Sequence, residues 1–288
     1  MTNDSTQRFL FEKHAIRGEI VRLDASIDAM VDKQNYPQAL AALLGESLAA
    51  ASLMSSILKF DGRVSVQFQG QGPTSLLYAE ATDKQKVKAY AKWTEACNGD
   101  SFKDLLSDGH LVVTIEPEGG KRYQGIVPLE SDSLSACLEK YFELSEQLKT
   151  GLWIFVDGSC VNGLLLQQLP GHQDEDFWQH LTILADTLQA VDFTSWNNQN
   201  LLQRLFAEED IRLFDAKPVE YVCGCSLERC ERSLMTLPPE EVQTLLAECQ
   251  GVIDMTCEVC KTVYQIDAVD VARLQGKHPN PGGGTGPH

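Results

Sequence analysis

The hydrophobic pattern of residues 39–58 predicts a long helix buried in a globular core. The segment holds a single charged residue, Glu46, and its large apolar side chains recur at three- and four-residue steps. Its length suits a membrane span, but its alanines, its serines and Gly45 make it too weakly apolar for one. The helical face consists of Leu40, Leu43, Leu44, Ser47, Leu48, Ala51, Met54 and Leu58. We therefore expect a core helix rather than a membrane anchor.

Alternating apolar and polar positions further along the chain predict an antiparallel meander. Residues 64–68 alternate strictly, which is the period of a strand with one buried face. Residues 75–79 and 87–93 can supply partner strands. The dipeptide Asp61–Gly62 is of the kind that joins hairpin strands, so we expect a hairpin turn there.

A second hairpin and a helix follow, which completes the pattern of a first domain. Residues 112–116 and 122–127 are expected to pair around a glycine-rich turn, and the apolar stripe of residues 133–149 predicts a helix. Further strands are expected over residues 20–23, 153–156 and 163–169. Strands in succession, with helices between them and no regular βαβ alternation, indicate an α+β core domain with antiparallel sheets and packed helices over residues 1–172.

Residues 174–217 combine high charge with many aromatic rings. They hold nine acidic and three basic side chains. Residues 177–191 present one apolar helical face and residues 201–206 a second, separated by the polar run 197–200. Neither helix is stable alone in water, so each must dock its apolar face on a neighbour, and the negative charge weakens that docking. We predict a metastable helical linker over residues 173–217.

The cysteines suggest a metal site in the C-terminal part of the chain. Six of the nine lie within 38 residues, and four of these form a C-x-C and a C-x-x-C pair separated by thirty-one residues. Two such pairs bring four thiolates around one tetrahedral zinc, and no histidine lies between them to offer nitrogen ligands. The predicted ligands are Cys223, Cys225, Cys257 and Cys260. We place them in a small zinc domain, residues 218–275, followed by a disordered tail, residues 276–288.

The other five cysteines have plainer explanations. Cys230 and Cys249 continue apolar helical faces, as does Cys137, and Cys160 follows a strand. We interpret these four as packed side chains, because free cysteine is common in protein cores. Cys97 gives no signal.

Composition and charge limit the classes of partner. The chain has 288 residues and 31.9 kDa, with 43% hydrophobic and 23% charged residues, which is ordinary globular usage. Its 24 basic and 41 acidic side chains give a net charge of -17, which repels a phosphate backbone. We therefore expect neither nucleic acid nor a membrane as a partner. The polar, acidic first residues are unlike a signal peptide, so we expect a cytoplasmic protein.

Motifs that mark common enzymes are incomplete here. The pair Gly70-x-Gly72 lacks a third glycine, Lys121 after two glycines is followed by arginine, and no G-x-S-x-G occurs. The six histidines are scattered without partners at a telling spacing. We expect no catalytic site and a protein that is not an enzyme.

The cysteine pairs are also able to form disulfides, which makes a redox response possible. Neighbours separated by one or two residues can bridge once a metal no longer holds them. A domain of this size supplies little core stability, whereas structural zinc contributes roughly 10 to 16 kcal/mol. Loss of zinc should therefore unfold the small domain, remove support from the linker and expose apolar surface.

Together with these pairs, three further stretches resemble the heat shock protein 33 family, the redox-regulated molecular chaperones. The C-x-C and C-x-x-C pairs are the hallmark of that family. The other likeness lies in residues 113–127 (VTIEPEGGKRYQGIV), 133–148 (SLSACLEKYFELSEQL) and 163–170 (GLLLQQLP). The resemblance extends over about residues 8–274.

The resemblance implies a cytoplasmic holdase chaperone that works without ATP hydrolysis. Reduced, it binds one zinc per chain and is idle; oxidised, it is zinc-free, holds unfolding client proteins and forms a homodimer. The resemblance implies the disulfide Cys257–Cys260 first and Cys223–Cys225 next, and that the linker and zinc domain cover the client surface in the reduced state. This chain departs from the four-thiol pattern in cysteines that can join mixed disulfides under strong oxidant. These are Cys97, Cys137, Cys160, Cys230 and Cys249.

Three other functions compete with the redox chaperone. A purely structural zinc is the simplest. A thiol-disulfide oxidoreductase is suggested by the C-x-x-C pair, but that motif should open a helix after a strand, and here it follows a helix. A zinc ribbon that binds nucleic acid or protein should have basic side chains near its cysteines, whereas residues 218–275 contain four basic and ten acidic residues.

Overall fold

Mostly antiparallel sheets and helices make up the computed structural model, which describes residues 4–32, 34–59, 61–94, 97, 99–171 and 174–277. The chain divides into two compact units, Met1–Val222 and Cys223–His288. The predicted α+β class is confirmed. Helix α10 (Ala268–Lys277) includes the first two residues of the predicted disordered tail, and residues 278–288 lie outside the described residues.

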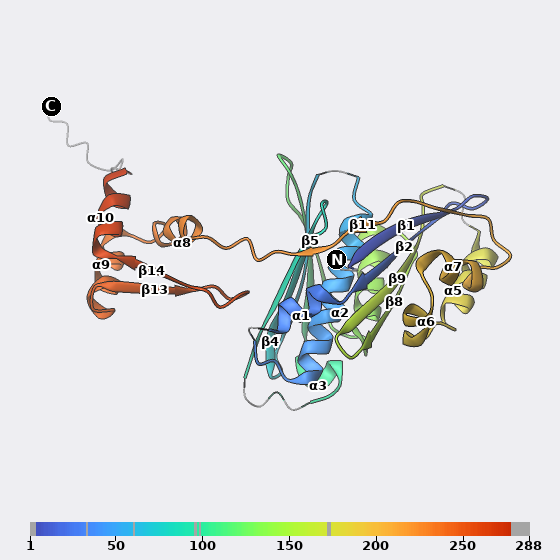
Figure 1. Cartoon of the computed structure of the whole chain (residues 1–288), viewed down its shortest axis with the longest axis horizontal. Coiled ribbons are helices and arrows are strands. Elements are labelled where there is room, and N and C mark those ends of the chain that lie inside the picture. The colour runs from blue at the N-terminus through green and yellow to red at the C-terminus, as the bar shows by residue number, and fades with distance from the viewer. Residues whose placement is uncertain are drawn as a thin grey trace. The chain divides into compact units, whose positions relative to one another are not determined.

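Helix α2 (Gln38–Ser56) lies between two six-stranded sheets of the first unit (Figure 1). The first sheet has the order β10-β1-β2-β9-β8, with β11 also paired to β1, and every pairing is antiparallel. Its strands are β1 (Ser5–Phe11), β2 (Ile16–Leu23), β8 (Thr150–Asp157), β9 (Cys160–Gln168), β10 (Ile211–Leu213) and β11 (Lys217–Pro218). Strands β2, β8 and β9 were expected, whereas β1 was not predicted.

The second sheet has the order β12-β5-β4-β3-β6-β7 and contains the predicted meander and the predicted second hairpin. Its strands are β3 (Gly62–Gly70), β4 (Thr74–Thr82), β5 (Lys86–Trp93), β6 (Gly109–Pro117), β7 (Tyr123–Pro128) and β12 (Glu220–Tyr221), which pairs with β5 in parallel. The hairpin expected at Asp61–Gly62 is wrong, because the preceding segment is helix α2. Glycine is needed at position 62 for another reason: a Cβ there would lie 2.4 Å from the carbonyl oxygen of Glu116 on β6.

Helix α2 is the predicted core helix. Fourteen of its residues are buried, among them Leu40, Leu44, Leu48 and Leu53. Among the described residues it is also the one helix long and apolar enough to cross a membrane, but 78% of that stretch is buried inside the protein. Such burial is the pattern of a core helix, so the interpretation as a buried helix is confirmed.

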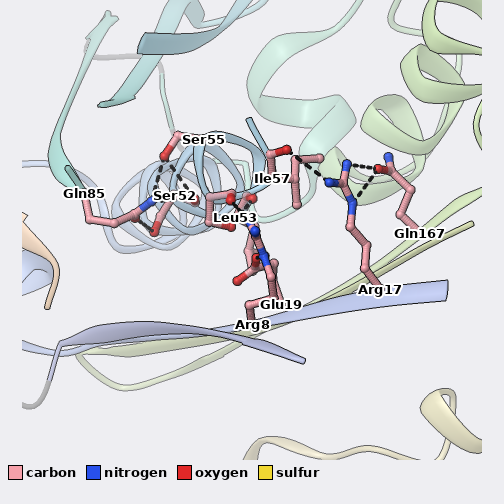
Figure 2. A network of polar contacts seen from close by, with 10 residues as sticks. Arg8, Arg17, Glu19, Ser52, Leu53, Ser55, Ile57, Gln85 and Gln167 are labelled. Atoms are coloured by element: carbon pink, nitrogen blue, oxygen red, sulfur yellow. Dashed lines mark hydrogen bonds and ion pairs between the residues drawn. The ribbon is translucent and has the colours of Figure 1, made fainter. Parts of the chain in front are cut away.

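Two arginines from the first sheet meet the C-terminal end of α2 (Figure 2). Arg8 on β1 donates to the carbonyl oxygen of Ser56 and pairs with Glu19 at 2.6 Å, and Arg17 on β2 donates to the carbonyl oxygen of Ile57 at 3.1 Å. Terminal helix carbonyls lack partners within the helix and carry partial negative charge, so buried cations are favourable there. Burial, together with the charge of Arg8, lowers the pKa of Arg17 to about 10. The arginines therefore anchor the core helix to the sheet.

Glu46 makes the stability of the first unit depend on pH. Burial raises the pKa of this α2 carboxyl from 4.5 to about 7. In the unfolded chain the Glu46 carboxyl therefore ionises at a lower pH than in the folded protein. The folded state loses stability as the pH rises from about 4.5 to 7, by about 3 kcal/mol in total. We expect Glu46→Gln to match the wild type in urea unfolding at pH 4.5 and to exceed it at pH 8. Tryptophan fluorescence reports this unit, which contains all four tryptophans; equal stabilities at pH 8 would contradict the prediction.

Shorter helices complete the core. They are α1 (Ala25–Val31), α3 (Phe102–Leu106), α4 (Leu134–Tyr141) and the π-helical turn η1 (Phe142–Glu146). The helix expected over residues 133–149 begins as predicted, with the Ser133 hydroxyl accepting from the Ala136 amide at 3.2 Å. It ends earlier than expected because Gln147 adopts a left-handed conformation, with φ of 55°.

The linker helices lie on the face of the first sheet opposite α2 (Figure 1). They are α5 (Glu175–Ala185), α6 (Ala190–Ser195) and α7 (Asn198–Leu205). Phe193, Leu201 and Leu202 pack there against a buried sheet face that includes Phe9 and Ile20. The expected docking of apolar helical faces on a neighbour is thus confirmed. The single face predicted over residues 177–191 is wrong at its end, because the helix breaks after α5 and Val191 is 55% exposed.

Arg22 on β2 joins the first sheet to the linker helices. Its guanidinium donates to Asn198 Oδ1 at 2.6 Å, to the carbonyl oxygen of Trp196 at 2.7 Å and to the carbonyl oxygen of Phe193. It also lies over the Phe193 ring, 5.5 Å from the centroid. The Asn198 amide in turn donates to Gln7 Oε1 on β1 at 2.8 Å. We call these contacts of Arg22 the Arg22 clamp.

The second unit contains helices α8 (Leu227–Leu234), α9 (Pro239–Glu248) and α10, and the hairpin of β13 (Val252–Thr256) and β14 (Val263–Asp267). Its described core has six buried apolar side chains. They are Leu234, Val242, Leu246, Ile253, Ile266 and Val271. A core this small contributes only a few kcal/mol, so the unit needs another source of stability.

Candidate metal centre

Two sharp turns position the four predicted cysteine ligands. Cys223 and Cys225 flank Gly224, whose φ of 66° is readily adopted only by glycine. The second pair lies in the turn between β13 and β14, where the Cys257 amide donates to the carbonyl oxygen of Thr262 at 2.9 Å. The C-x-x-C pair therefore sits in a hairpin turn and does not open a helix, as an oxidoreductase motif would.

The four sulfurs meet at one place. All four Sγ atoms lie within 4.8 Å of one another, and two of the separations, Cys223 to Cys257 and Cys225 to Cys260, are 3.3 Å. A tetrahedron built on zinc–sulfur distances of about 2.3 Å has edges of about 3.8 Å. The arrangement thus fits a tetrahedral metal, and these closely spaced thiols can hold one. All four residues are half-buried.

Electrostatics at the cluster favour a bound cation. Burial opposes ionisation of Cys260, but its hydrogen bonds with Thr262 and with the neighbouring thiols outweigh burial and lower the pKa of this thiol to about 6. Burial, with contributions from neighbouring thiols, raises the pKa of Cys223 and of Cys225. Four thiolates in one half-buried site repel one another, so a cation is needed before all of them ionise. Sulfur donors favour zinc over magnesium or calcium.

Hydroxyl groups beside the sulfurs were missed from the sequence. Tyr264 Oη lies 3.1 Å from Cys225 Sγ, and Thr262 Oγ1 lies 3.2 Å from Cys260 Sγ. Tyr264 is the second residue of β14, whereas Cys260 and Thr262 lie in the turn before it, where Lys261 has a φ of 55°. Because the contacts depend on this turn, no periodic pattern in the sequence indicated them.

The five other cysteines lie outside this cluster. Cys137 is buried, as expected for a packed side chain, and Cys230 packs against the small core of the second unit. Cys97, for which the sequence indicated no role, is buried too. Cys160 is half-buried, and burial and nearby Asp24 raise the pKa of its thiol. The packing expected for Cys249 is wrong: α9 ends at Glu248, so Cys249 turns off the helical face and is exposed.

Comparisons with known proteins point to one family. A family model described as Hsp33 protein matches residues 4–267. A 33 kDa chaperonin of Shewanella baltica is 42% identical over 277 residues, covering 95% of this chain and 96% of the relative. Another, of Shewanella frigidimarina, is 41% identical over 281 residues, covering 96% and 98%.

A solved structure gives the same result for the fold. The crystal structure of the 33 kDa chaperonin from Thermotoga maritima matches with a TM-score of 0.80 at 20% identity, over 95% of this chain and 98% of the other. At that identity the match supports the fold alone. The family model and the closely related chaperonins extend over nearly the whole chain, and the chain therefore belongs to the heat shock protein 33 family.

Proposed function

We propose that the chain is a holdase chaperone controlled by oxidation, which needs no ATP and is not an enzyme. The observation that carries the proposal is the convergence of four thiols in a unit with only six buried apolar side chains in its described core. In such a unit the metal and the fold depend on each other. The chaperone names of the relatives support the same role.

The proposed switch begins at the cysteines. One zinc per chain, bound by Cys223, Cys225, Cys257 and Cys260, keeps the four sulfurs as thiolates. Peroxide takes two electrons from a pair of thiolates: one disulfide forms, the O–O bond breaks, and two water molecules leave after taking up protons. The proposed bridges are Cys223–Cys225 and Cys257–Cys260. Bridging within each pair removes the ligands, and zinc is released.

The proposed output is the apolar face beneath the linker helices. Phe9, Phe11, Ile20, Leu164 and Leu166 of the first sheet are at most 3% exposed while α5 to α7 cover them. Release of those helices would uncover a continuous apolar surface that unfolding client proteins can bind. The active form is expected to be a homodimer in the cytoplasm, with no role for nucleic acid or membrane.

An oxidation experiment tests the proposal. We expect hydrogen peroxide to release one zinc per chain and to convert a protein that does not prevent aggregation of a heat-denatured client enzyme into one that does. Thiol reductant with zinc should reverse both changes. The variant Cys249→Ser is the matched control, because Cys249 is exposed and outside the cluster. Equal client protection before and after oxidation would contradict the proposal.

A further inference from the structure

The four sulfurs of the cluster have unequal surroundings. Cys225 and Cys260 each contact a hydroxyl, from Tyr264 at 3.1 Å and from Thr262 at 3.2 Å. Across the described residues, the sulfurs of Cys223 and Cys257 have no such hydroxyl contact. They lie 3.3 Å from each other, and the Cys223 sulfur also has hydrogen bonds with Cys225 and Cys260. Each pair therefore contains one sulfur with a hydroxyl partner and one without.

The asymmetry matters for chemistry at a metal-held thiolate. With all four sulfurs ionised around the cation, differences in protonation no longer distinguish them. In this structure the Cys260 thiol donates to Thr262 Oγ1, but an ionised sulfur can only accept, so the Thr262 hydroxyl then becomes the donor. A hydroxyl that donates to a thiolate draws charge from the lone pair that would attack an oxidant, and it fixes the direction of the sulfur. Cys225 and Cys260, which have a hydroxyl partner, are thus expected to be the less nucleophilic sulfur of each pair. Cys223 and Cys257 are expected to be the more nucleophilic ones.

We propose that Tyr264 and Thr262 are positioning residues that decide which sulfur of each pair an oxidant attacks first. The proposal rests on the redox function proposed above. In the C-x-x-C pair, the Cys257 thiolate attacks peroxide, the O–O bond breaks, and a sulfenic acid and hydroxide form. The Cys260 thiolate then attacks the Cys257 sulfur, the disulfide forms and a second hydroxide leaves. Each hydroxide takes a proton from solvent to give water. In the C-x-C pair, Cys223 is attacked first and Cys225 closes the bridge.

The test maps sulfenic acid in the full-length, zinc-loaded protein. Peroxide below one equivalent is added in the presence of excess 1,3-diketone, which alkylates sulfenic acid, and each cysteine is quantified by mass spectrometry. In the wild type we expect labelling of Cys223 and Cys257 to exceed that of Cys225 and Cys260 by about ten-fold, the rate equivalent of one hydrogen bond to a charged group. Equal labelling of the four would overturn the proposal.

Variants of the two hydroxyl residues then assign the effect. Thr262→Val is expected to raise labelling of Cys260 about ten-fold and Tyr264→Phe that of Cys225, with zinc affinity in chelator competition falling by about ten-fold in each. Thr262→Ser keeps a hydroxyl and should behave as the wild type. Thr256→Val is the matched control, since Thr256 is an exposed residue of the same hairpin with no contact to a sulfur among the described hydrogen bonds.

The two proposals fail in different ways. If the variants leave the labelling pattern unchanged while peroxide still activates client protection, the positioning role of the hydroxyls is wrong and the redox switch stands. If no condition links oxidation to client protection, the proposed function itself is wrong. Circular dichroism of each zinc-loaded variant checks that the second unit is folded before labelling is compared.

Discussion

Removal of zinc from the reduced protein is expected to unfold residues 223–277 while the core of the first unit around α2 and the second sheet stays folded. The second unit has six buried apolar side chains in its described core, which supply only a few kcal/mol, whereas structural zinc supplies roughly 10 to 16 kcal/mol. Hydrogen exchange measures this directly. In excess chelator, the amides of α9 and of the β13–β14 hairpin should lose protection, while those of β3 and β6 at the centre of the second sheet should keep it.

Single cysteine variants separate loss of the metal from loss of a thiol. Cys257→Ser removes one of the four converging sulfurs and should exchange as the chelated wild type does, even with zinc present. Cys249→Ser changes an exposed thiol outside the cluster and should stay protected until chelator is added. Retained protection of α9 and the hairpin in the metal-depleted wild type would disprove the coupling of metal to fold.

The segment between α7 and Cys223 is weakly held in the first unit. Three short strands fix it there: β10 and β11 pair with β1, and β12 pairs with two residues of β5. Strands of two or three residues offer few hydrogen bonds and open at low cost in free energy. Unfolding of the second unit removes the ordered structure at one end of this segment. Exchange in α5, α6 and α7 after chelation therefore measures how far the loosening spreads.

Local periodicity was enough to predict most of the first unit. The alternation in β3 and the three- and four-residue spacing in α2 each reflect one buried face, and short-range pattern carries that information. Strand β1 was not predicted, because its polar side chains bind partners elsewhere in the fold. Arg8 pairs with Glu19 and donates to the end of α2, and Gln7 donates to the carbonyl oxygen of Phe214. The local sequence of a strand stabilised by such contacts resembles a polar N-terminal segment without regular structure.

At the candidate site, spacing predicted which sulfurs converge but not what surrounds them. Close pairs such as C-x-C report on local turns, so the four cysteines were recognisable in isolation. The Arg22 clamp was not, because Arg22 and Asn198 are 176 positions apart. Contacts of this kind follow from the packing of the linker on the sheet, which no local pattern encodes.

Loss of the Arg22 clamp is expected to activate the protein without oxidation. Arg22→Leu removes three hydrogen bonds and leaves acceptors of Phe193, Trp196 and Asn198 without the donor they had. Burial lowers the pKa of Arg22, which shows that desolvation of the guanidinium offsets part of the free energy that its hydrogen bonds contribute. We therefore estimate that the substitution weakens linker docking by about 3 kcal/mol. A loss of that size raises the open fraction of the linker about 150-fold. The reduced variant should then prevent client aggregation with its zinc still bound.

Two measurements and one control make this outcome specific. Zinc content and client protection are measured on the same reduced sample, and fluorescence of Trp178 and Trp196 in the linker reports its release. Arg204→Leu is the matched control: it removes a cation whose described contact is the Trp196 ring, at 4.3 Å, within the linker itself. That variant should remain idle until oxidised. If reduced Arg22→Leu protein is equally idle, the clamp does not hold the linker over the sheet, and the apolar packing of α5 to α7 must suffice to keep it closed.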